Sequence, residues 1–279
     1  MNYRPSLPSD TPVLTKLWKE VFGDTEDYIH RFLVHFGIDA GYVCETDCKI
    51  VAMAFALPTV LNFPLNSPPL KGIGDGLNTL KYIYACATHP EYRGKGIMGN
   101  LLAIIYEEAC KENAAGIFLQ AARPSLINYY KRLGFKEFFF REDSIYYKQD
   151  YPLNSLRLKH FNRIAPKQYK QKREQKLENN CFVNWDENFF RFVMENEIYF
   201  CEYENTIFSY KTDFNKIIVD ELLGETPKEQ IVLLLFKEFP DFEVVHIRSM
   251  GNDFCCGQMK WCNLSNENPQ NGWFAFAME

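Results

Sequence analysis

Apolar side chains in the first half of the chain alternate between helical and strand-like spacing. Helical spacing predicts a helix over residues 13–21, capped at Ser9 or Asp10, and a second helix over residues 25–36. Alternating or continuous apolar runs predict strands over residues 42–45, 50–57, 80–87 and 116–122. An amphipathic helix over residues 96–105 separates the last two strands. The pattern therefore predicts a mixed α/β (α+β) domain.

A similar order of elements returns in the second half. From residue 156 the pattern changes, and a helix is then expected over residues 187–194. Further elements are predicted as strands at 198–203, 207–210 and 216–222, a helix at 227–239, and strands at 242–248 and 273–278. A length of 279 residues also favours two domains. We predict a boundary near residue 150, giving domains 1–150 and 151–279.

A glycine-rich turn lies between the strand at 80–87 and the helix that follows it. Its sequence is Arg93-Gly-Lys-Gly-Ile-Met-Gly99. The first N–H groups of a helix have no partner within the helix, and they lie at the positive end of the helix dipole. The turn is therefore a candidate site for a phosphate or diphosphate.

Several ligands fit this pattern. Residues 94–99 satisfy Gly-x-Gly-x-x-Gly, but a dinucleotide fingerprint directly follows its strand and is followed by an acidic residue ending the next strand. Here six residues, 88–93, separate the predicted strand at 80–87 from the first glycine of the pattern. The next predicted strand, at 116–122, ends without a carboxylate. No Ser or Thr follows a Gly-Lys pair as in a Walker loop. An ordinary exposed turn is the structural alternative.

Two motifs resemble the GNAT acyl-CoA N-acyltransferases. Arg93 and Gly96 occupy the first and fourth positions of the family's Arg/Gln-x-x-Gly-x-Gly/Ala loop, and Met98 departs from the sixth, with Gly99 directly after it. Residues 128–135 resemble the family's helix that ends in Tyr-x-x-x-Gly-Phe, with Tyr130 as its tyrosine. The resemblance covers residues 1–148. It implies the GNAT fold, a mixed central sheet flanked by helices, and a second, degenerate GNAT-like α+β domain without the diphosphate loop.

The resemblance also implies a reaction, the transfer of an acetyl group from acetyl-CoA to a primary amine by direct attack. The backbone amide of Cys86 would polarise the thioester carbonyl, and Tyr130 would protonate the leaving sulfur. A covalent role for the Cys86 thiolate lacks a paired base. Residues implied to hold the coenzyme are Cys86, Ala87, Thr88, Arg93, Gly94, Lys95, Gly96, Ile97, Met98, Gly99, Ser125, Asn128 and Tyr130.

The general base is not identified by the sequence. Many family members carry a Glu four residues before the carbonyl-binding amide, and this position is Tyr82 here. Asp75, Tyr84 and the terminal carboxylate of Glu279 are alternatives. A second glycine run, residues 72–76, is not followed by a helix and is interpreted as a turn.

Charge and cysteine usage narrow the function further. A net charge of −5 argues against general nucleic-acid binding, and the basic segment 167–180 is interpreted as a solvated helix face. Nine scattered cysteines indicate reduced thiols in a cytoplasmic protein without a metal site, and no apolar run is long enough for a membrane span. The expected partner is a small-molecule or peptide amine. A non-catalytic CoA-binding regulatory module, an aminoacyl-tRNA-dependent transferase and a homodimer stay open.

Overall fold

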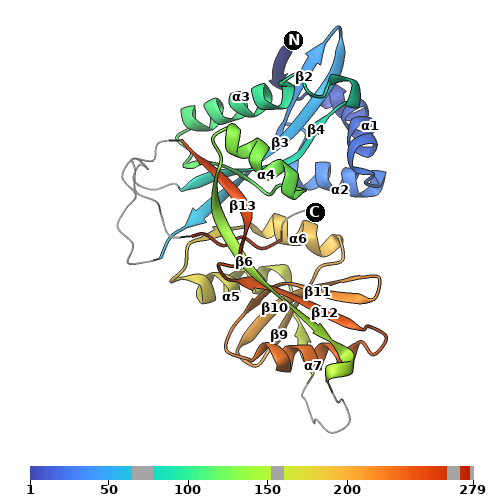
Figure 1. Cartoon of the computed structure of the whole chain (residues 1–279), viewed down its shortest axis with the longest axis vertical. Coiled ribbons are helices and arrows are strands. Elements are labelled where there is room, and N and C mark those ends of the chain that lie inside the picture. Colours follow the sequence, from blue (N-terminus) through green and yellow to red (C-terminus); the bar gives the residue numbers. More distant parts are fainter. Residues whose placement is uncertain (65–77, 152–159, 263–270, 277–279) are drawn as a thin grey trace.

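The computed structural model describes residues 1–64, 78–151, 160–262 and 271–276. Within these ranges, thirteen strands form one mixed sheet with seven α-helices against it (Figure 1). The strands are β1 Asn2–Pro5, β2 Gly41–Thr46, β3 Lys49–Asn62, β4 Thr79–Thr88, β5 Gly116–Leu119, β6 Lys136–Tyr147, β7 Asn162–Arg163, β8 Phe182–Asn184, β9 Tyr199–Tyr203, β10 Thr206–Asp213, β11 Lys216–Leu223, β12 Val244–Met250 and β13 Phe254–Trp261. The helices are α1 Thr11–Phe22, α2 Glu26–Phe36, α3 Ile97–Lys111, α4 Pro124–Arg132, α5 Pro166–Leu177, α6 Glu187–Glu195 and α7 Lys228–Glu238. The predicted mixed α/β class is confirmed.

The predicted repetition of elements is also present in the sheet. In the first half, β2, β3 and β4 pair antiparallel, and β4 then pairs parallel with β5 through the crossover helix α3. In the second half, β9, β10 and β11 pair antiparallel, and β11 pairs parallel with β12 through α7. A short edge strand precedes each set, with β1 on β2 and β7 on β9. The two halves therefore share one topology.

Strands β6 and β13 join the halves (Figure 1). The first part of β6 pairs with β13, and its second part, from Arg141 to Tyr147, pairs with β12. Strand β13 lies between β5 and β6, so the chain returns from the second half to complete the sheet of the first. A boundary at residue 150 stays a prediction, and the strand exchange couples the two parts across it.

Near the joint, one strand prediction was wrong and one strand was missed. The predicted strand at 273–278 is reduced to a single bridge between Trp273 and Phe182, and residues 277 and 278 lie outside the described chain. Strand β13 was not predicted, and β6 continues well beyond its apolar run at 138–140. The charged side chains of this continuation are paired. Glu142 pairs with Lys228 of α7, and Asp143 lies 3.1 Å from His246 of β12.

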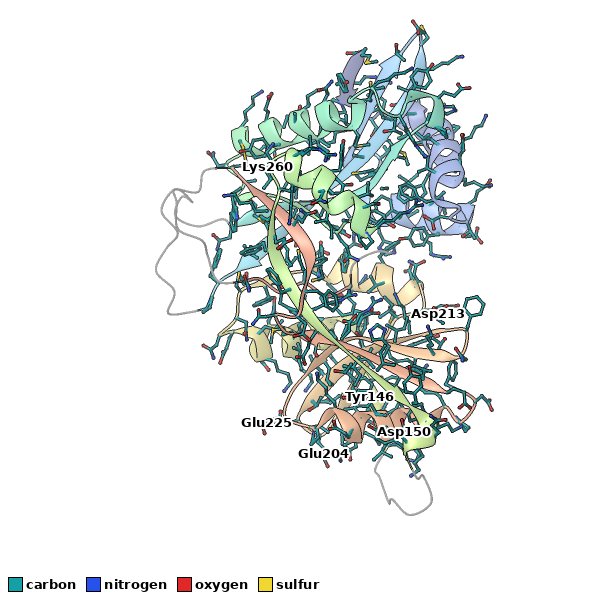
Figure 2. The ribbon with its side chains drawn as sticks, in the orientation of Figure 1. Tyr146, Asp150, Glu204, Asp213, Glu225 and Lys260 are labelled. Atoms are coloured by element: carbon teal, nitrogen blue, oxygen red, sulfur yellow. A yellow bond between two sulfur atoms is a disulfide. The ribbon has the colours of Figure 1, made fainter. Side chains whose placement is uncertain are left out.

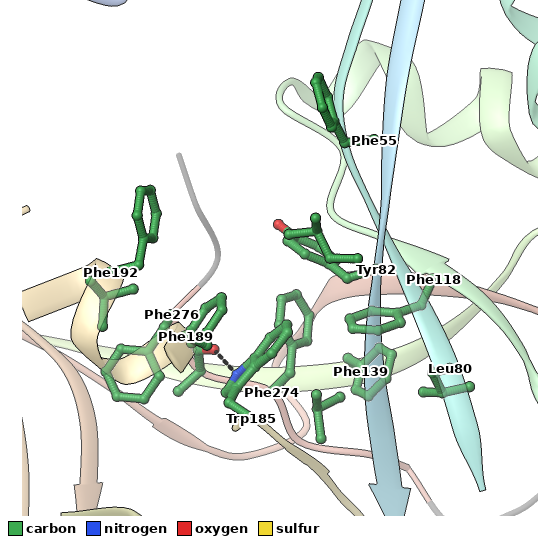
Figure 3. Close-up of a cluster of buried hydrophobic side chains, with 14 of the residues drawn as sticks. Phe55, Leu80, Tyr82, Phe118, Phe139, Trp185, Phe189, Phe192, Phe274 and Phe276 are labelled. Carbon is green, nitrogen blue, oxygen red and sulfur yellow. Dashed lines mark hydrogen bonds between the residues drawn. The ribbon is translucent and has the colours of Figure 1, made fainter. Parts of the chain in front are cut away.

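An aromatic core lies between the halves (Figure 3). The rings of Trp185 and Phe189 stack at 4.0 Å, and the Trp185 indole donates a hydrogen bond to the Ala275 carbonyl at 3.0 Å. Phe274 packs between Phe118 of β5 and Phe139 of β6, with ring centroids 5.6 and 4.9 Å away. Residues from both halves therefore share a single interior.

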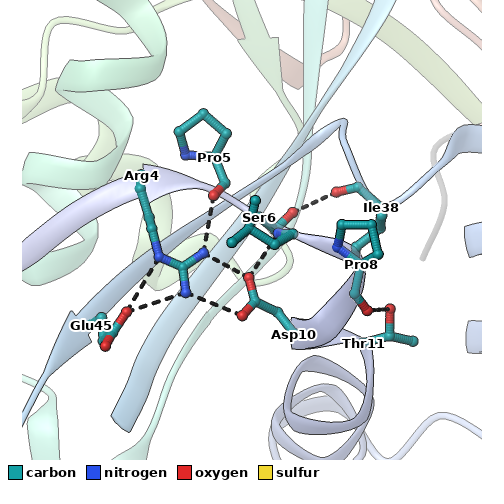
Figure 4. A network of polar contacts seen from close by, with 9 residues as sticks. Arg4, Pro5, Ser6, Pro8, Asp10, Thr11, Ile38 and Glu45 are labelled. Carbon is teal, nitrogen blue, oxygen red and sulfur yellow. Dashed lines mark hydrogen bonds and ion pairs between the residues drawn. The ribbon is translucent and has the colours of Figure 1, made fainter. Parts of the chain in front are cut away.

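A polar network fixes the start of the chain to the sheet (Figure 4). The Arg4 guanidinium donates to both carboxylate oxygens of Asp10, at 2.7 and 3.1 Å, and also to Glu45 of β2. Arg4 holds the pKa of Asp10 below its usual value. Asp10 takes the cap position of α1, as predicted, but its carboxylate accepts from the Leu7 N–H and not from the helix.

The basic segment 167–180 is not simply a solvated face. It forms most of α5, and one of its cations, Arg173, is fully buried and pairs with the equally buried Glu221 at 2.9 Å. The interpretation was wrong for this residue because charge counting does not distinguish a paired, buried guanidinium from an exposed one. Lys167, on the same helix, is exposed as expected.

The prediction of nine reduced cysteines also needs correction. Cys110, at the end of α3, and Cys262, after β13, form a disulfide with Cα atoms 5.3 Å apart. The other seven cysteines are free. The pair is 152 residues apart in the chain, so no local spacing could reveal it.

The buried thiols predict a loss of stability in alkaline solution. Burial raises the pKa of Cys181 from 9.0 to about 12, so between these values the folded state keeps a proton that the unfolded state has lost. The free energy of unfolding should then fall as the pH rises through this window, by about 1.4 kcal/mol per pH unit for one thiol. In urea titrations, Cys181→Ala should flatten this slope, whereas Cys48→Ala, at an exposed position, should not. An unchanged slope in Cys181→Ala would contradict the assignment.

Candidate functional site

Strands β4 and β5 separate near the middle of the first half. They pair only from Leu80 to Tyr82 on β4, opposite Gly116 to Phe118 on β5. Beyond Tyr82, β4 continues for six residues, to Thr88, without β5 beside it. This separation opens the sheet between its two faces.

A bulge in β4 turns one backbone amide toward this gap. Met53 pairs with Ala87 and Phe55 with Tyr84, so two residues of β4 lie opposite the single residue between them on β3. Ala85, one of the two, has a φ of +49°, which is uncommon for a residue other than glycine. The His89 N–H donates to the Val51 carbonyl of β3 at 2.9 Å, and the alternation of N–H groups along β4 therefore places the Cys86 N–H on the other edge, toward the gap.

A cavity of about 510 Å³ occupies the gap. It is lined mostly by apolar and aromatic side chains, and Asp24 is the only acidic residue among the described residues of its wall. Its walls come from α1, the α1–α2 turn, β4, the end of β5 and α4: Trp18, Phe22, Asp24, Tyr82, Ile83, Tyr84, Ala85, Cys86, Leu119, Gln120, Ala122, Leu126 and Tyr130. Cys86 and Tyr130, predicted from separate motifs, thus lie in one cavity.

Tyr130 and Cys86 contact each other on the face covered by α3 and α4. The Tyr130 hydroxyl and the Cys86 thiol lie close enough to interact through a hydrogen bond. Burial raises the pKa of the Cys86 thiol to about 12, and burial together with the neighbouring thiol raises the pKa of Tyr130 well above its ordinary value. Both groups therefore keep their protons at neutral pH. A protonated Cys86 thiol is a poor nucleophile, whereas a protonated Tyr130 is a hydrogen-bond donor.

The glycine-rich turn is exposed at the start of α3. Gly94 and Gly96 have φ values of +76° and +75°, a conformation that favours glycine. Gly96 caps the helix without a side-chain hydrogen bond, and the first helical bond runs from the Asn100 N–H to the Gly96 carbonyl. The N–H groups of residues 97–99 therefore have no partner within the helix. This is the geometry that an anion-binding turn requires.

The side chains of the other residues predicted to contact the coenzyme differ in their surroundings. The Arg93 side chain bonds the Thr88 carbonyl at 3.0 Å, and the Lys95 ammonium lies 4.8 Å from the centre of the Tyr92 ring. Ser125 and Asn128 are exposed on α4 and are not among the residues that line the cavity.

Gly99 brings α3 close to α4. A side-chain carbon at this position would lie 3.3 Å from a methyl group of Leu133 and 3.7 Å from the Tyr129 hydroxyl. The glycine after Met98 thus allows the anion-binding end of α3 to approach the helix that carries Tyr130.

The opposite end of the cavity carries a residue that the sequence did not indicate. Asp24 follows Gly23, the C-cap of α1, and resembles an ordinary loop residue. In the structure the Trp18 indole donates to its carboxylate at 2.7 Å. Only the packing of α1 against β4 brings Asp24 to the cavity, so no local pattern could have placed it there.

Some of the residues considered for the general base lie at the cavity, and others lie outside the described residues. Tyr84 lines the cavity, with its hydroxyl 2.8 Å from that of Tyr28, and burial raises its pKa well above the ordinary value, so it is not a base at neutral pH. Tyr82 is buried in the wall and stacks on Tyr84 at 6.0 Å. Asp75, Glu279 and the glycine run at 72–76 lie outside the described residues.

The equivalent turn of the second half differs from the glycine-rich turn. Residues 223–227 contain a single glycine, and the Thr226 N–H is already bonded to the Thr206 hydroxyl at 3.0 Å. Glu225 adds a negative charge there, and Figure 2 shows it in the lower part of the molecule, well below Lys260. This turn offers no comparable site for an anion.

Two further properties concern only the described residues. No group of three or more His, Cys, Asp or Glu side chains in this part of the chain is arranged to hold a metal ion. None of the described helices combines the length and the apolar character needed to cross a membrane.

Comparisons with known proteins agree with this architecture. Among curated proteins, none matches the sequence. Similar solved structures include a GCN5-related N-acetyltransferase from Kribbella flavida, with 15% identity, a TM-score of 0.70, and 93% of this chain and 70% of that one covered. A conserved protein from Enterococcus faecalis V583 has 13% identity and a TM-score of 0.73, covering 94% and 72%. A GCN5-related N-acetyltransferase from Anabaena variabilis has 13% identity and a TM-score of 0.65, covering 92% and 70%.

At sequence identities this low, the similarity to these structures establishes the fold alone. It covers both halves of the chain. A family model, the acetyltransferase (GNAT) domain, matches residues 2–138, the part that contains the glycine-rich turn and Tyr130. Residues 2–138 therefore form a GNAT acetyltransferase domain.

Proposed function

We propose that the protein is an N-acetyltransferase that moves an acetyl group from acetyl-CoA to a primary amine. The observation that carries the proposal is the cavity at the gap in the sheet, with Cys86 and Tyr130 in its wall and the glycine-rich turn on the same face as Tyr130. The amine is a small molecule or a peptide N-terminus. Neither a nucleic acid nor a membrane is part of the proposal, and a cytoplasmic location is proposed with it.

The described residues fit the diphosphate of the coenzyme. The N–H groups of residues 97–99 are oriented outward at the positive end of α3, and there is open space at both Gly94 and Gly96. Residues 93–96 are exposed, so the anion has access from solvent. Ala87 and Thr88 continue β4 toward this turn and would lie along the coenzyme.

The proposed reaction uses one backbone and one side-chain donor. The amine nitrogen attacks the thioester carbon, and the Cys86 N–H stabilises the negative charge that forms on the carbonyl oxygen, an effect typically worth about 3–4 kcal/mol. The carbon–sulfur bond then breaks, the electron pair stays on sulfur, and the amine gives up one proton to solvent water. Tyr130 donates a hydrogen bond to the leaving sulfur. The pKa of Tyr130 exceeds that of a thiol, so we infer that Tyr130 acts mainly by stabilising the leaving sulfur through this hydrogen bond. Any proton that Tyr130 gives to the sulfur is replaced from solvent.

Turnover measurements test the proposal directly. The protein is incubated with acetyl-CoA and a panel of primary amines, and release of the free CoA thiol is followed together with the acetylated amine. We expect thiol release that depends on the amine. Binding of CoA without turnover for any amine would instead favour a non-catalytic CoA-binding module. Salt-dependent binding of tRNA would favour the aminoacyl-tRNA-dependent transferase.

Replacing Gly96 tests the diphosphate site. Gly96→Val places a β-branched residue at a φ of +75°, which moves or strains the turn that holds the three outward N–H groups. We expect CoA to bind at least about tenfold more weakly, since several charge-assisted hydrogen bonds are misplaced. The change in melting temperature caused by CoA, taken relative to each protein without ligand, separates lost binding from general destabilisation. Unchanged CoA affinity would move the diphosphate site elsewhere.

A further inference from the structure

The cavity has a polar corner on the face of the sheet covered by α1 and α2. Asp24 accepts a hydrogen bond from the Trp18 indole through Oδ2, at 2.7 Å. The hydroxyls of Tyr28 and Tyr84 are 2.8 Å apart, and burial raises the pKa of each, with a smaller contribution from the charge of Asp24. A carboxylate and two phenols that keep their protons thus lie together in one corner.

This corner is separated from the reaction centre by the sheet itself. The Tyr84 side chain belongs to the core on the α1 and α2 face, together with Trp18, whereas Cys86 packs with Tyr130 on the α3 and α4 face. A group held by Asp24 therefore lies on the opposite side of the sheet from the Cys86 thiol.

The chemistry of the corner fits a cation. The second carboxylate oxygen of Asp24, Oδ1, has no partner among the described residues, and it lies in a cavity whose walls are mostly apolar. Aromatic rings line the same cavity as Asp24, and the Trp18 ring lies 5.7 Å from that of Tyr84 and 6.3 Å from that of Phe22. A carboxylate with nearby ring faces attracts an ammonium through both its charge and cation–π contacts.

We propose that Asp24 binds a cationic group of the acceptor that is different from the amine that is acylated. The inference rests on the proposed acetyl transfer and makes it more specific. The preferred acceptor is then a diamine or a similar doubly cationic molecule. One ammonium is held at Asp24, and the other amine reaches through the gap between β4 and β5 toward the Cys86 N–H.

The test compares Asp24→Asn with a matched control. An asparagine oxygen still accepts the Trp18 hydrogen bond, so the variant removes the charge and keeps the contact. Asp27→Asn makes the same change three residues later, at an exposed position of α2 that does not line the cavity. Each protein is titrated calorimetrically with straight-chain α,ω-diamines and with the monoamine of the same carbon number, in the absence of an acyl donor.

We expect the unmodified protein to bind the best diamine at least about tenfold more tightly than its monoamine, as one charge-assisted contact allows. Asp24→Asn should abolish this preference and leave CoA affinity unchanged, and Asp27→Asn should retain it. In turnover assays, Asp24→Asn should raise KM for the diamine by a similar factor while kcat stays nearly constant.

Other results overturn the inference. Equal affinity of the unmodified protein for each diamine and its monoamine would do so, as would the same loss in Asp27→Asn. A fall in kcat of Asp24→Asn for both amines at constant KM would place Asp24 on the reacting amine. Diamine binding that depends on Asp24 without any acetyl transfer would support the cation site and reject the proposed reaction, so the two failures are distinguishable.

Discussion

Tyr130→Phe is expected to lower kcat by about a hundredfold while CoA affinity changes little. General acid catalysis and hydrogen bonding to a leaving group contribute on this scale. The ring of Tyr130 is almost fully buried against Phe135 and Tyr129, so phenylalanine preserves the packing and removes only the hydroxyl that now faces Cys86. The loss should therefore fall on the step in which the carbon–sulfur bond breaks.

Tyr129→Phe is the matched control for this variant. It removes the same hydroxyl one residue earlier on α4, from a ring that is only half buried and does not line the cavity. Steady-state turnover, with CoA affinity measured separately by calorimetry, distinguishes the two variants. Equal kcat values for the Tyr130→Phe and unmodified proteins would remove Tyr130 from the mechanism, and a shared loss with Tyr129→Phe would indicate a structural effect.

The parts of this site that local sequence could predict are those made by short segments. A turn with two glycines at positive φ, a helix start and a strand are all specified within a few residues, and the motif spacing then related the turn to Tyr130. The cavity brings Cys86 and Tyr130 together because β4, α3, β5 and α4 are consecutive in the chain.

What the sequence did not indicate depends on contacts between distant segments. Strand β13 enters the first half between β5 and β6 after more than a hundred intervening residues, and the Cys110–Cys262 disulfide closes the same long loop. Asp24 reaches the cavity only because α1 packs across β4. The charged part of β6 resembles a loop in composition, and it is a strand because β12 and Lys228 supply partners for Glu142 and Asp143.

Arg173 is the strongest case of a distant contact, and its replacement should have the largest effect on stability. Arg173→Met leaves the Glu221 carboxylate buried without a cation. Both side chains are fully buried, and Glu221 also accepts hydrogen bonds from Tyr169 at 2.9 Å and from Trp273 at 2.6 Å. Removing one partner of a buried pair typically costs about 3–5 kcal/mol, because the remaining charge is desolvated and uncompensated. We expect a loss of this size in the free energy of unfolding, measured in urea.

A second substitution separates the lost charge pair from lost packing. In the double variant Arg173→Met with Glu221→Gln, the carboxylate is replaced by a neutral amide whose oxygen still accepts from Trp273 or Tyr169. Most of the stability should return, since neutral replacements of buried ion pairs are often tolerated. Lys167→Met, at an exposed position of the same helix, should change stability by less than about 0.5 kcal/mol. If the double variant were as unstable as Arg173→Met alone, the cause would be the packing of α5 against Phe182 and not the unpaired carboxylate.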